Sequence, residues 1–441
     1  MTSCYRSLAG LLLLCVMLNG CGAGSSDSGT IPDSAENTDN TNSVTDNSNI
    51  EDSHESEESN GSSENDNSEE EQEESSEEEQ QEESQENANQ EPAEFAQTPL
   101  LATLPDNTAV DLGGYTCEDP QGDMEGRCGG ITDYSGFVYD RHRHQMLQFG
   151  GGHATTMNNS VMAFDFETLS WSNLYTPNSC DDMSEGNFNT ETQTWSSTGY
   201  PSARHTYDLM VVTETTKEFA LLRGGGGWGY CAQFEMYGSA ISHYDVDQSQ
   251  WNVLPIDYPW TGYSSAELDP IDDVVVVVSP HKIHIYDPNS GEVLTSFSHN
   301  QSGHLSDSRN LVYYPPTDTM YYFVNGGSVF ELVIDREDIT NSTLMPVEGI
   351  NGDIPEMIET GFAYDSSNEI IGGGVRDGVF YVFDPVTQEW ISKTINYDET
   401  GAARPGTQAF HSTDYDPINN VFIYITGLAD GRHTWAYKYK N

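Results

Sequence analysis

Basic residues are scarce in this chain of 441 residues, which has 16 Lys and Arg against 72 Asp and Glu. A formal net charge of −56 at pH 7 repels the phosphates of nucleic acids and anionic membrane surfaces. The sequence also has no P-loop, no dinucleotide-binding glycine pattern and no zinc-protease motif. These absences argue against nucleic acid as a partner and give no signal for nucleotide-dependent or zinc-dependent catalysis.

Long apolar runs are almost absent, and the one that exists lies at the N-terminus. Arg6 precedes an apolar stretch over residues 8–17, which is too short to span a bilayer and has the composition of a secretory signal. Residues 18–21, Leu-Asn-Gly-Cys, resemble the lipobox of bacterial lipoproteins, in which the cysteine is acylated. We expect residues 1–21 to be a lipoprotein signal peptide with Cys21 as the lipidation site. An ordinary secretory signal is the alternative.

The predicted anchor also predicts a location. An acylated cysteine supplies the two lipid chains that stable membrane attachment needs. Gly22, and not an aspartate, follows the cysteine, which by resemblance to known lipoprotein sorting favours the outer membrane. We expect an exported protein, anchored at the outer membrane or cell surface and touching the membrane only through its lipid.

From Gly22 to Ala96 the chain has 25 Asp and Glu and no Lys or Arg, with Ser, Asn, Gln and Gly at most other positions. Such a segment cannot bury enough apolar surface to offset the entropy of ordering it, and its like charges extend it. We expect residues 22–95 to be a disordered acidic linker and residues 96–441 to be the folded domain. From residue 97 onward, 47 acidic residues face 15 basic ones.

Cysteine is also rare. Of seven cysteines, two lie in the predicted signal peptide and one is the predicted lipidation site. The even set that remains favours two disulfides in an oxidising compartment. The expected pairs are Cys117–Cys128 and Cys180–Cys231. A zinc site would need more closely spaced cysteine pairs; no cofactor is implied, and structural calcium or zinc stays open.

One motif recurs through the predicted folded domain. An apolar stretch ends on an aromatic residue and a turn at residues 136–140, a second β-rich run ends in glycines at 146–152, and a third ends in a turn before tryptophan at 163–171. The same order returns at 244–251 and 383–390. Turns that close the first run recur near Asp140, Asp269, Pro315, Asp365 and Asp416, the last four spaced by about 45 to 52 residues.

This period and strand order resemble those of kelch proteins, so the predicted fold is all-β, a kelch-type β-propeller of four-stranded blades. Six repeats can be delimited, starting near residues 131, 204, 262, 308, 360 and 409. The last repeat ends after its third strand at 434–439, and a ring must hide its edges. We expect its outer strand to come from residues 99–112. Residues 189–195 look like another hairpin, so seven blades stay open.

The topology predicts which residues meet. Strands alternate in direction, so the loops between second and third strands (b–c) and the connections between blades emerge on one face, above a channel lined by the first strands. Arginine, histidine and tyrosine gather at these positions, although the mature chain has few basic residues. The set is His153, Arg204, His205, Tyr207, Arg223, Tyr263, His304, Arg309, Arg376, Arg404 and His411. A structural corner that repeats for folding reasons is the alternative.

A cleft of this composition suits an anionic sugar, since arginine pairs bidentately with a uronate carboxylate and aromatic rings stack on sugar faces. The corresponding reaction is β-elimination. Arginine would make the proton beside the carboxylate more acidic, a histidine or tyrosine would remove it, and a tyrosine would protonate the leaving oxygen. Hydrolysis needs two facing carboxylates, and Asp and Glu are sparse among these positions.

Residues 150–153 (Gly-Gly-Gly-His), residues 204–207 (Arg-His-Thr-Tyr), Arg223 and Tyr263 resemble the layout of the propeller-fold ulvan lyases. The resemblance implies His153 as acid/base, Arg223 as neutraliser of the carboxylate, and Tyr207 and Tyr263 as proton-handling or substrate-positioning tyrosines. The other members of the set would bind substrate. That family has a second cleft histidine about twenty residues before the first, where this chain reads Thr-Asp-Tyr at 132–134. Another substrate, a different base or no catalysis therefore stays open.

Three functions remain in competition. The first is a lyase that acts on a uronate-containing polysaccharide, sulfated or not. That anionic polysaccharide would be the partner of a monomeric protein. The second is a non-catalytic glycan-binding lipoprotein, and the third is a propeller that binds other proteins. Two histidine pairs fall outside the site: His142 and His144 are expected at a solvated strand end, and His281 and His284 are expected to be structural.

Overall fold

The computed structural model describes residues 95–115, 134–150, 158–222, 227–228, 235–236, 240–254, 258–260, 264–299, 309–324, 326–355, 361–397, 408–428 and 431–441. They belong to the unit that spans Gln85–Asn441. Residues 1–94, which hold the predicted signal peptide, Cys21 and almost all of the predicted linker, lie outside the described residues.

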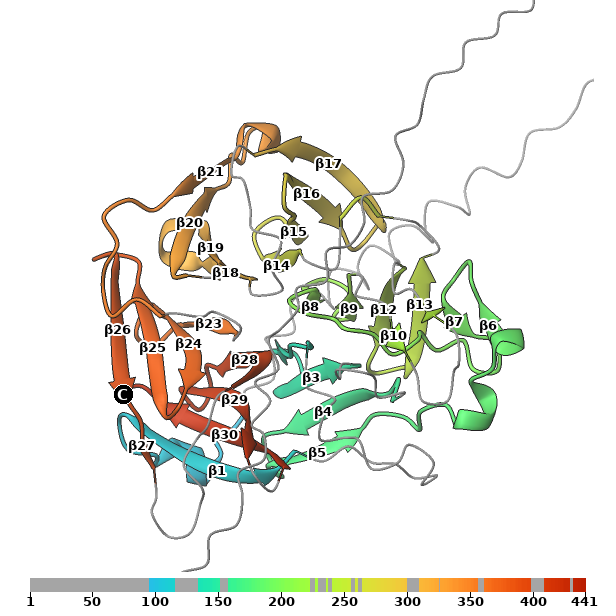
Figure 1. Cartoon of the computed structure of the whole chain (residues 1–441), viewed down its shortest axis with the longest axis horizontal. Coiled ribbons are helices and arrows are strands. Elements are labelled where there is room, and N and C mark those ends of the chain that lie inside the picture. Colours follow the sequence, from blue (N-terminus) through green and yellow to red (C-terminus); the bar gives the residue numbers. More distant parts are fainter. Residues whose placement is uncertain are drawn as a thin grey trace, which may run out of the picture. The chain divides into compact units, whose positions relative to one another are not determined.

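The strands form six sheets around a centre, the blades of a β-propeller, numbered here in chain order (Figure 1). Blade 1 has β2 (Val138–Asp140), β3 (Gln145–Phe149), β4 (Val161–Asp165) and β5 (Ser170–Asn173). Blade 2 has β8 (Met210–Val212), β9 (Phe219–Leu221), β12 (Ile241–Asp245) and β13 (Gln250–Leu254). Blade 3 has β14 (Ser265–Asp269), β15 (Val274–Val278), β16 (Lys282–Asp287) and β17 (Glu292–Ser298).

Blade 4 has β18 (Arg309–Tyr314), β19 (Thr319–Val324), β20 (Ser328–Val333) and β21 (Thr343–Pro346). Blade 5 has β23 (Phe362–Asp365), β24 (Ile370–Arg376), β25 (Val379–Asp384), β26 (Glu389–Thr394) and, outermost, β22 (Asn351–Gly352). Blade 6 has β28 (Gln408–Asp416), β29 (Val421–Leu428), β30 (Gly431–Lys438), β1 (Thr108–Gly114) and, outermost, β27 (Asn396–Tyr397). The predicted propeller and its six repeats are confirmed. The kelch type of the blades stays a prediction.

The inner strands contact one another in chain order, and β28 of blade 6 contacts β2 of blade 1. The ring is closed by the N-terminal chain, as predicted. Strand β1 pairs antiparallel with β30, with Val110 opposite Ala436, and supplies the outer strand that the last repeat lacks. Closure leaves the third strand of blade 6 without a bare edge. No helix in the described part of the chain is long and apolar enough to cross a membrane.

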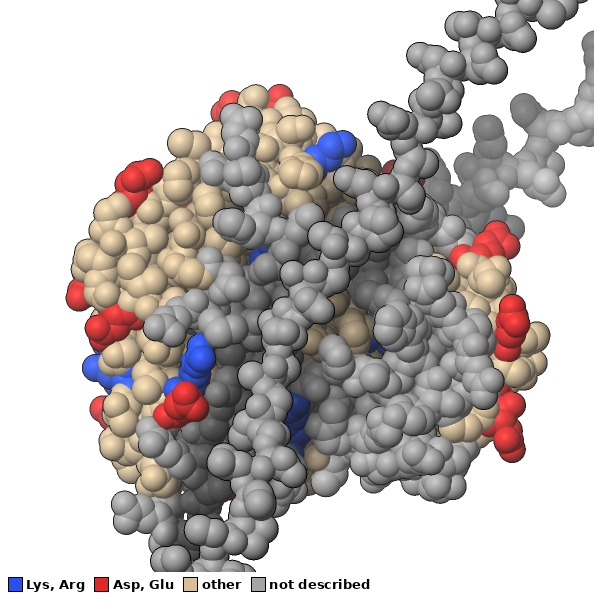
Figure 2. All heavy atoms as spheres, in the orientation of Figure 1, with Lys and Arg blue, Asp and Glu red and all other residues tan. Residues whose placement is uncertain are grey.

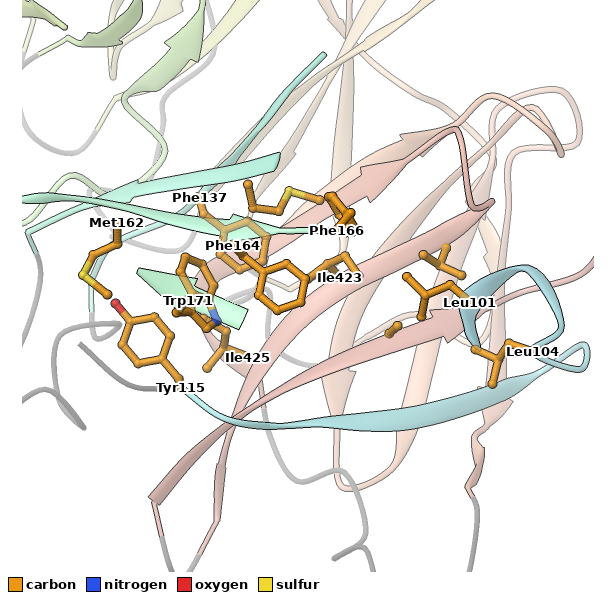
Figure 3. Close-up of a cluster of buried hydrophobic side chains, with 13 residues drawn as sticks. Leu101, Leu104, Tyr115, Phe137, Met162, Phe164, Phe166, Trp171, Ile423 and Ile425 are labelled. Carbon is orange, nitrogen blue, oxygen red and sulfur yellow. The ribbon is translucent and has the colours of Figure 1, made fainter. Parts of the chain in front are cut away.

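Apolar cores lie between neighbouring blades. Both faces of a blade are covered, so consecutive strand residues are buried alternately against the blades on either side. Val274–Val278 shows this, since all five valines are buried. In the cluster between blades 6 and 1, Phe164 and Trp171 face Ile423, and Leu101 from helix α2 (Pro99–Ala102) joins them (Figure 3).

The additional hairpin at residues 189–195 is not a seventh blade. Strands β6 (Phe188–Asn189) and β7 (Thr194–Trp195) form a separate two-stranded sheet in the insertion between blades 1 and 2. The fully buried ring of Trp195 lies 5.1 Å from the ring of Phe188. A hairpin-like pattern predicts local pairing only, and here no inner strands join the hairpin to make a blade. A second two-stranded sheet consists of β10 (Gly227–Trp228) and β11 (Glu235–Met236).

The periodic aspartates have a structural role at the a–b turns, which join the first and second strands of a blade. Asp140, Asp269, Asp365 and Asp416 each end an inner strand, and each side chain accepts the backbone N–H two residues further on at 2.9 to 3.0 Å. This Asx turn reverses the chain. In blade 4 the turn is a 3-10 helix that begins at Pro315. The sequence period therefore reflects turn chemistry.

The expectation of a solvated strand end at His142 and His144 is wrong for His144. Its ring is buried, stacks on Phe166 with centroids 4.6 Å apart, and lies 3.2 Å from both carboxylate oxygens of Asp416. Blade 6 packs over this turn and excludes water. The structural role of His284 is confirmed: it is fully buried and lies within hydrogen-bond distance of the hydroxyls of Ser279 and Ser296.

Candidate functional site

The central channel contains a cavity of about 390 Å³. Its lining comes from the inner strand of every blade, β2, β8, β14, β18, β23 and β28, and extends to the a–b turns at Pro270, Pro315 and Pro417. Figure 1 shows β8, β14, β18, β23 and β28 around the centre of the ring. The volume lies within the range of small-molecule sites, about 300 to 1,000 Å³.

The six inner strands can be aligned by their pairing with the second strand of the same blade. In this alignment, one equivalent position of every inner strand lines the cavity. The six residues are Val138, Val211, Glu267, Val312, Ala363 and Asp414. Four of them are apolar. The two acids, the carboxyl pair, come from blades 3 and 6, which lie opposite each other because the six inner strands follow chain order around the ring.

Asp414 accepts a backbone hydrogen bond from the next blade, since its Oδ2 accepts the N–H of Tyr139 at 2.6 Å. The Tyr313 N–H of the next blade acts on Glu267 and lowers its pKa. Each carboxyl also accepts a neighbouring N–H of its own strand. Inner strands are sheet edges with unpaired N–H groups, so one function of these acids is to satisfy those donors.

Burial disfavours the charged form of both acids. It raises the pKa of Glu267 to about 8, with the nearby charge of Asp414 adding to the effect. It raises the pKa of Asp414 to about 6. Arg141 at the first turn lowers both pKa values by a smaller amount. At neutral pH, Glu267 is therefore mostly protonated and Asp414 mostly ionised.

Thr413 lines the same cavity beside Asp414. Thr413 is 5 % exposed, and its Oγ1 has no hydrogen-bond partner among the described residues. A buried hydroxyl without a partner is unfavourable by about 1 to 3 kcal/mol. A ligand in the cavity that reached this hydroxyl would remove that cost.

Tyrosines surround the turn end of the cavity. Tyr139, Tyr313, Tyr364 and Tyr415 all line it, and their strands place them at equivalent positions next to the a–b turns. The hydroxyl of Tyr313 donates to Asp318 at 3.0 Å. Such rings offer apolar faces for packing and hydroxyls for hydrogen bonds.

A cluster of four rings, the aromatic cluster, lies at the end of the channel where the inner strands begin. It consists of Tyr134, His205, Tyr207 and His411. The Tyr134 ring lies 4.9 Å from that of His205, and the Tyr207 ring lies 6.4 Å from that of His411. The Tyr207 hydroxyl is 3.5 Å from Nδ1 of His205. Because His411 also lines the cavity, the cluster and the cavity are continuous.

Three members of the aromatic cluster have left-handed backbones. Their φ angles are 59° at Tyr134, 48° at Tyr207 and 53° at His411. Such conformations cost about 1 to 3 kcal/mol each in residues other than glycine and concentrate at functional sites. Backbone hydrogen bonds hold them here: Tyr207 N donates to Tyr134 O at 2.9 Å, and Gly136 N donates to Tyr207 O at 3.0 Å. Twelve other described residues that are not glycine share this conformation, so it does not by itself mark a functional site.

The structure brings three predicted site residues together, His205, Tyr207 and His411, and joins them to Tyr134, one of the residues that stand where the resembled family has a second histidine. Two predicted substrate-binding arginines are instead inside the fold. Arg204 is 1 % exposed and donates to the carbonyls of Ser202 and Ala240. Burial lowers its pKa to about 10.

Arg309 is 2 % exposed and hydrogen-bonds the hydroxyl of Tyr322. Arg376 is half-buried at the end of β24. The described arginines therefore do not form one cationic surface. The remaining predicted residues lie outside the described part of the chain: His153, Arg223, Tyr263, His304 and Arg404.

The disulfide predictions stay predictions. Cys117, Cys128 and Cys231 lie outside the described residues, and Cys180 begins a short 3-10 helix, Cys180–Asp182, in the insertion after blade 1. Sequence reasoning also missed the carboxyl pair and Thr413. Their signal was an acid inside an otherwise apolar inner strand, as in Ala266-Glu267-Leu268.

Acidic side chains also predominate outside the channel. In Figure 2, Asp and Glu are spread around the visible rim, and Lys and Arg are few. Among the described residues, no group of three or more His, Cys, Asp or Glu side chains is arranged to hold a metal ion.

The chain is similar to the solved structures of two auxiliary nutrient binding proteins, from Bacteroides thetaiotaomicron and Bacteroides ovatus. Each is 13% identical to it, with a TM-score of 0.43, and the similarity covers 78% of this chain and 74% of the other. No family model and no curated protein matches the chain. A similarity with this identity and TM-score does not indicate the function of this chain.

Proposed function

We propose that this protein is a glycan-binding propeller that holds its ligand in the central channel. The observation that carries the proposal is the cavity itself, which combines apolar walls, tyrosine rings and a few polar groups. Sugars need this combination, because their C–H faces pack on rings while their hydroxyls pair with buried polar groups. The aromatic cluster continues the binding surface beyond the cavity.

The polar groups of the cavity are placed to bind hydroxyls. Asp208 is half-buried and already accepts hydrogen bonds from the Asn310 side chain at 2.6 Å and the Leu311 N–H at 2.9 Å. Protonated Glu267 can donate, ionised Asp414 can accept, and the Thr413 hydroxyl can do either. Within the proposal, Cys21 anchors the protein to the membrane and the acidic linker holds the propeller away from it.

The test is binding of the full chain to a panel of neutral, amino and acidic oligosaccharides, with Thr413→Val as the diagnostic variant. Valine has nearly the same shape and removes the unpartnered hydroxyl, so we expect unchanged or higher stability but about fivefold to tenfold weaker binding, the loss of one hydrogen bond.

Thr426→Val is the matched control. Thr426 is also fully buried with an unpartnered hydroxyl, but it does not line the cavity. It should leave binding unchanged. The proposal fails if no oligosaccharide binds, or if both variants bind like the parent.

A second candidate, β-elimination of a uronate polymer, is favoured by one observation, the 3.5 Å approach of the Tyr207 hydroxyl to His205. A tyrosine and a histidine in contact can transfer a proton. The residues that the ulvan-lyase resemblance assigns to the other steps lie outside the described residues. Ultraviolet absorbance of unsaturated uronates, measured on the acidic members of the panel, separates this activity from binding alone.

A further inference from the structure

Within the part of the chain that the structure describes, no arginine or lysine forms an ion pair with the carboxyl pair. Of the described residues that line the cavity, Arg141 carries the one permanent positive charge. Its Nη1 pairs with Glu214 at 3.1 Å, and the two side chains are 46% and 41% exposed, at the turn end of the channel. Water therefore screens this ion pair, whereas Glu267 and Asp414 lie deeper among Val138, Val312 and their equivalents.

Apart from Arg141 and His411, the described residues that line the cavity are acidic or neutral. Asp208 adds a third, half-buried carboxyl to the cavity. Tyr139 and Tyr313 line it from blades 1 and 4. An anionic ligand at this level would face the negative charge of Asp414 in a poorly solvated channel, which is unfavourable. A positively charged group would meet opposite charge and ring faces, which attract cations.

The hydroxyl of Thr413 is a further polar group of the cavity that a ligand could pair with. It is buried, lines the cavity and lies next to Asp414 in β28. A hydroxyl can accept a hydrogen bond from an ammonium group, and so can each carboxylate. An ammonium has three donors. Thr413 and Asp414 offer acceptors from blade 6, and Glu267 offers acceptors from the opposite blade 3.

We infer that the glycan bound in the channel is an amino sugar with a free ammonium group, held between Glu267 and Asp414 and hydrogen-bonded to Thr413. This inference rests on the proposed function and gives it a substrate class. It differs from the uronate expected from the sequence. Binding converts protonated Glu267 into a carboxylate paired with the ammonium, so a proton leaves the protein.

The experiment is titration calorimetry of the full chain with two disaccharides of the same β-1,4-linked backbone. One is built from glucosamine and the other from N-acetylglucosamine, so they differ in charge and in the acetyl groups. A galacturonate disaccharide is the acidic probe. At about pH 6.5 the amine is protonated, since free amines of this kind have pKa values near 8. Titrations in two buffers with different heats of ionisation give the number of protons released.

We expect the glucosamine disaccharide to bind at least about tenfold more tightly than its N-acetyl counterpart, as for a desolvated charge pair. It should release close to one proton per ligand. Glu267→Gln should remove the proton release and weaken binding by about tenfold or more, and Asp414→Asn should weaken it similarly. Glu337→Gln, at an exposed position, is the matched control and should bind like the parent.

The inference is overturned if the N-acetyl disaccharide binds as tightly as the amine, or if Glu267→Gln and Asp414→Asn both bind the amine like the parent. The latter result would place the amine on other acids, such as those of the linker. In either case, binding of another sugar that depends on Thr413 would still support the proposed function. If none of these sugars and no member of the wider panel binds, both the inference and the proposed function are wrong.

Discussion

Glu267→Gln should make the propeller more stable at alkaline pH and leave its stability unchanged at acidic pH. In the unfolded chain this carboxyl has its ordinary pKa of 4.5, and in the folded protein the pKa is about 8. Between these values the folded state binds the proton and the unfolded state does not. Rising pH therefore favours unfolding across this window, and the effect is complete above about pH 8.

The size of the effect follows from the difference between the two pKa values. Each pKa unit corresponds to about 1.4 kcal/mol, so Glu267 should lower the free energy of unfolding by roughly 3 to 5 kcal/mol between about pH 4.5 and about pH 8. Glutamine has the shape of protonated glutamate and keeps the oxygen that accepts the Leu268 N–H, but it does not ionise. Asp414 keeps a smaller effect of the same sign in both proteins, complete above about pH 6.

Urea unfolding followed by tryptophan fluorescence at several values from about pH 5 to about pH 9 measures this difference. We expect the midpoints of parent and variant to be close at the acidic end and to separate progressively as the pH rises. Glu337→Gln removes an exposed carboxyl of the same kind and should follow the parent throughout. Parallel profiles for parent and Glu267→Gln, or a variant that is less stable at the alkaline end, would refute the burial argument and remove a premise of the amino-sugar inference.

Three further predictions concern the anchor and the architecture. Cys21→Ser should abolish incorporation of labelled palmitate and release the protein from membranes; labelling of the variant would show that the lipobox interpretation is wrong. Removing residues 1–94 should leave the melting temperature nearly unchanged, whereas removing residues 1–115 should prevent cooperative unfolding because β1 is lost from blade 6; equal melting curves would contradict the closure. Arg336→Lys should lower the free energy of unfolding by about 1 to 3 kcal/mol in urea titrations, because lysine cannot reproduce the fork that links Asp269 and Asp318 across blades 3 and 4.

Much of the fold could be predicted because its signals are local. An aspartate that accepts the N–H two residues later reverses the chain wherever it occurs, so the repeated turns gave the period of the blades. The missing outer strand of the last repeat required an N-terminal strand, since an unpaired edge is unfavourable in a closed ring. The hairpin pattern at 189–195 left a seventh blade open, because a pattern of local pairing does not show whether the inner strands of a blade accompany it.

The site depended on contacts that no local pattern contains. Alternation along an inner strand assigns Glu267 to one of the two faces of the strand. It does not show that Asp414 lies opposite, because that position follows from the ring having six blades. Arg204 precedes a strand as predicted, yet the packing of blade 2 buries it against the carbonyl of Ala240. The blades and their turns could be predicted from the sequence because hydrogen bonds between near neighbours specify them, and the closure could be predicted because the last repeat lacks its outer strand. Which side chains share the channel was decided by the tertiary structure alone, since burial and charge pairing there depend on residues that the ring brings together from distant blades.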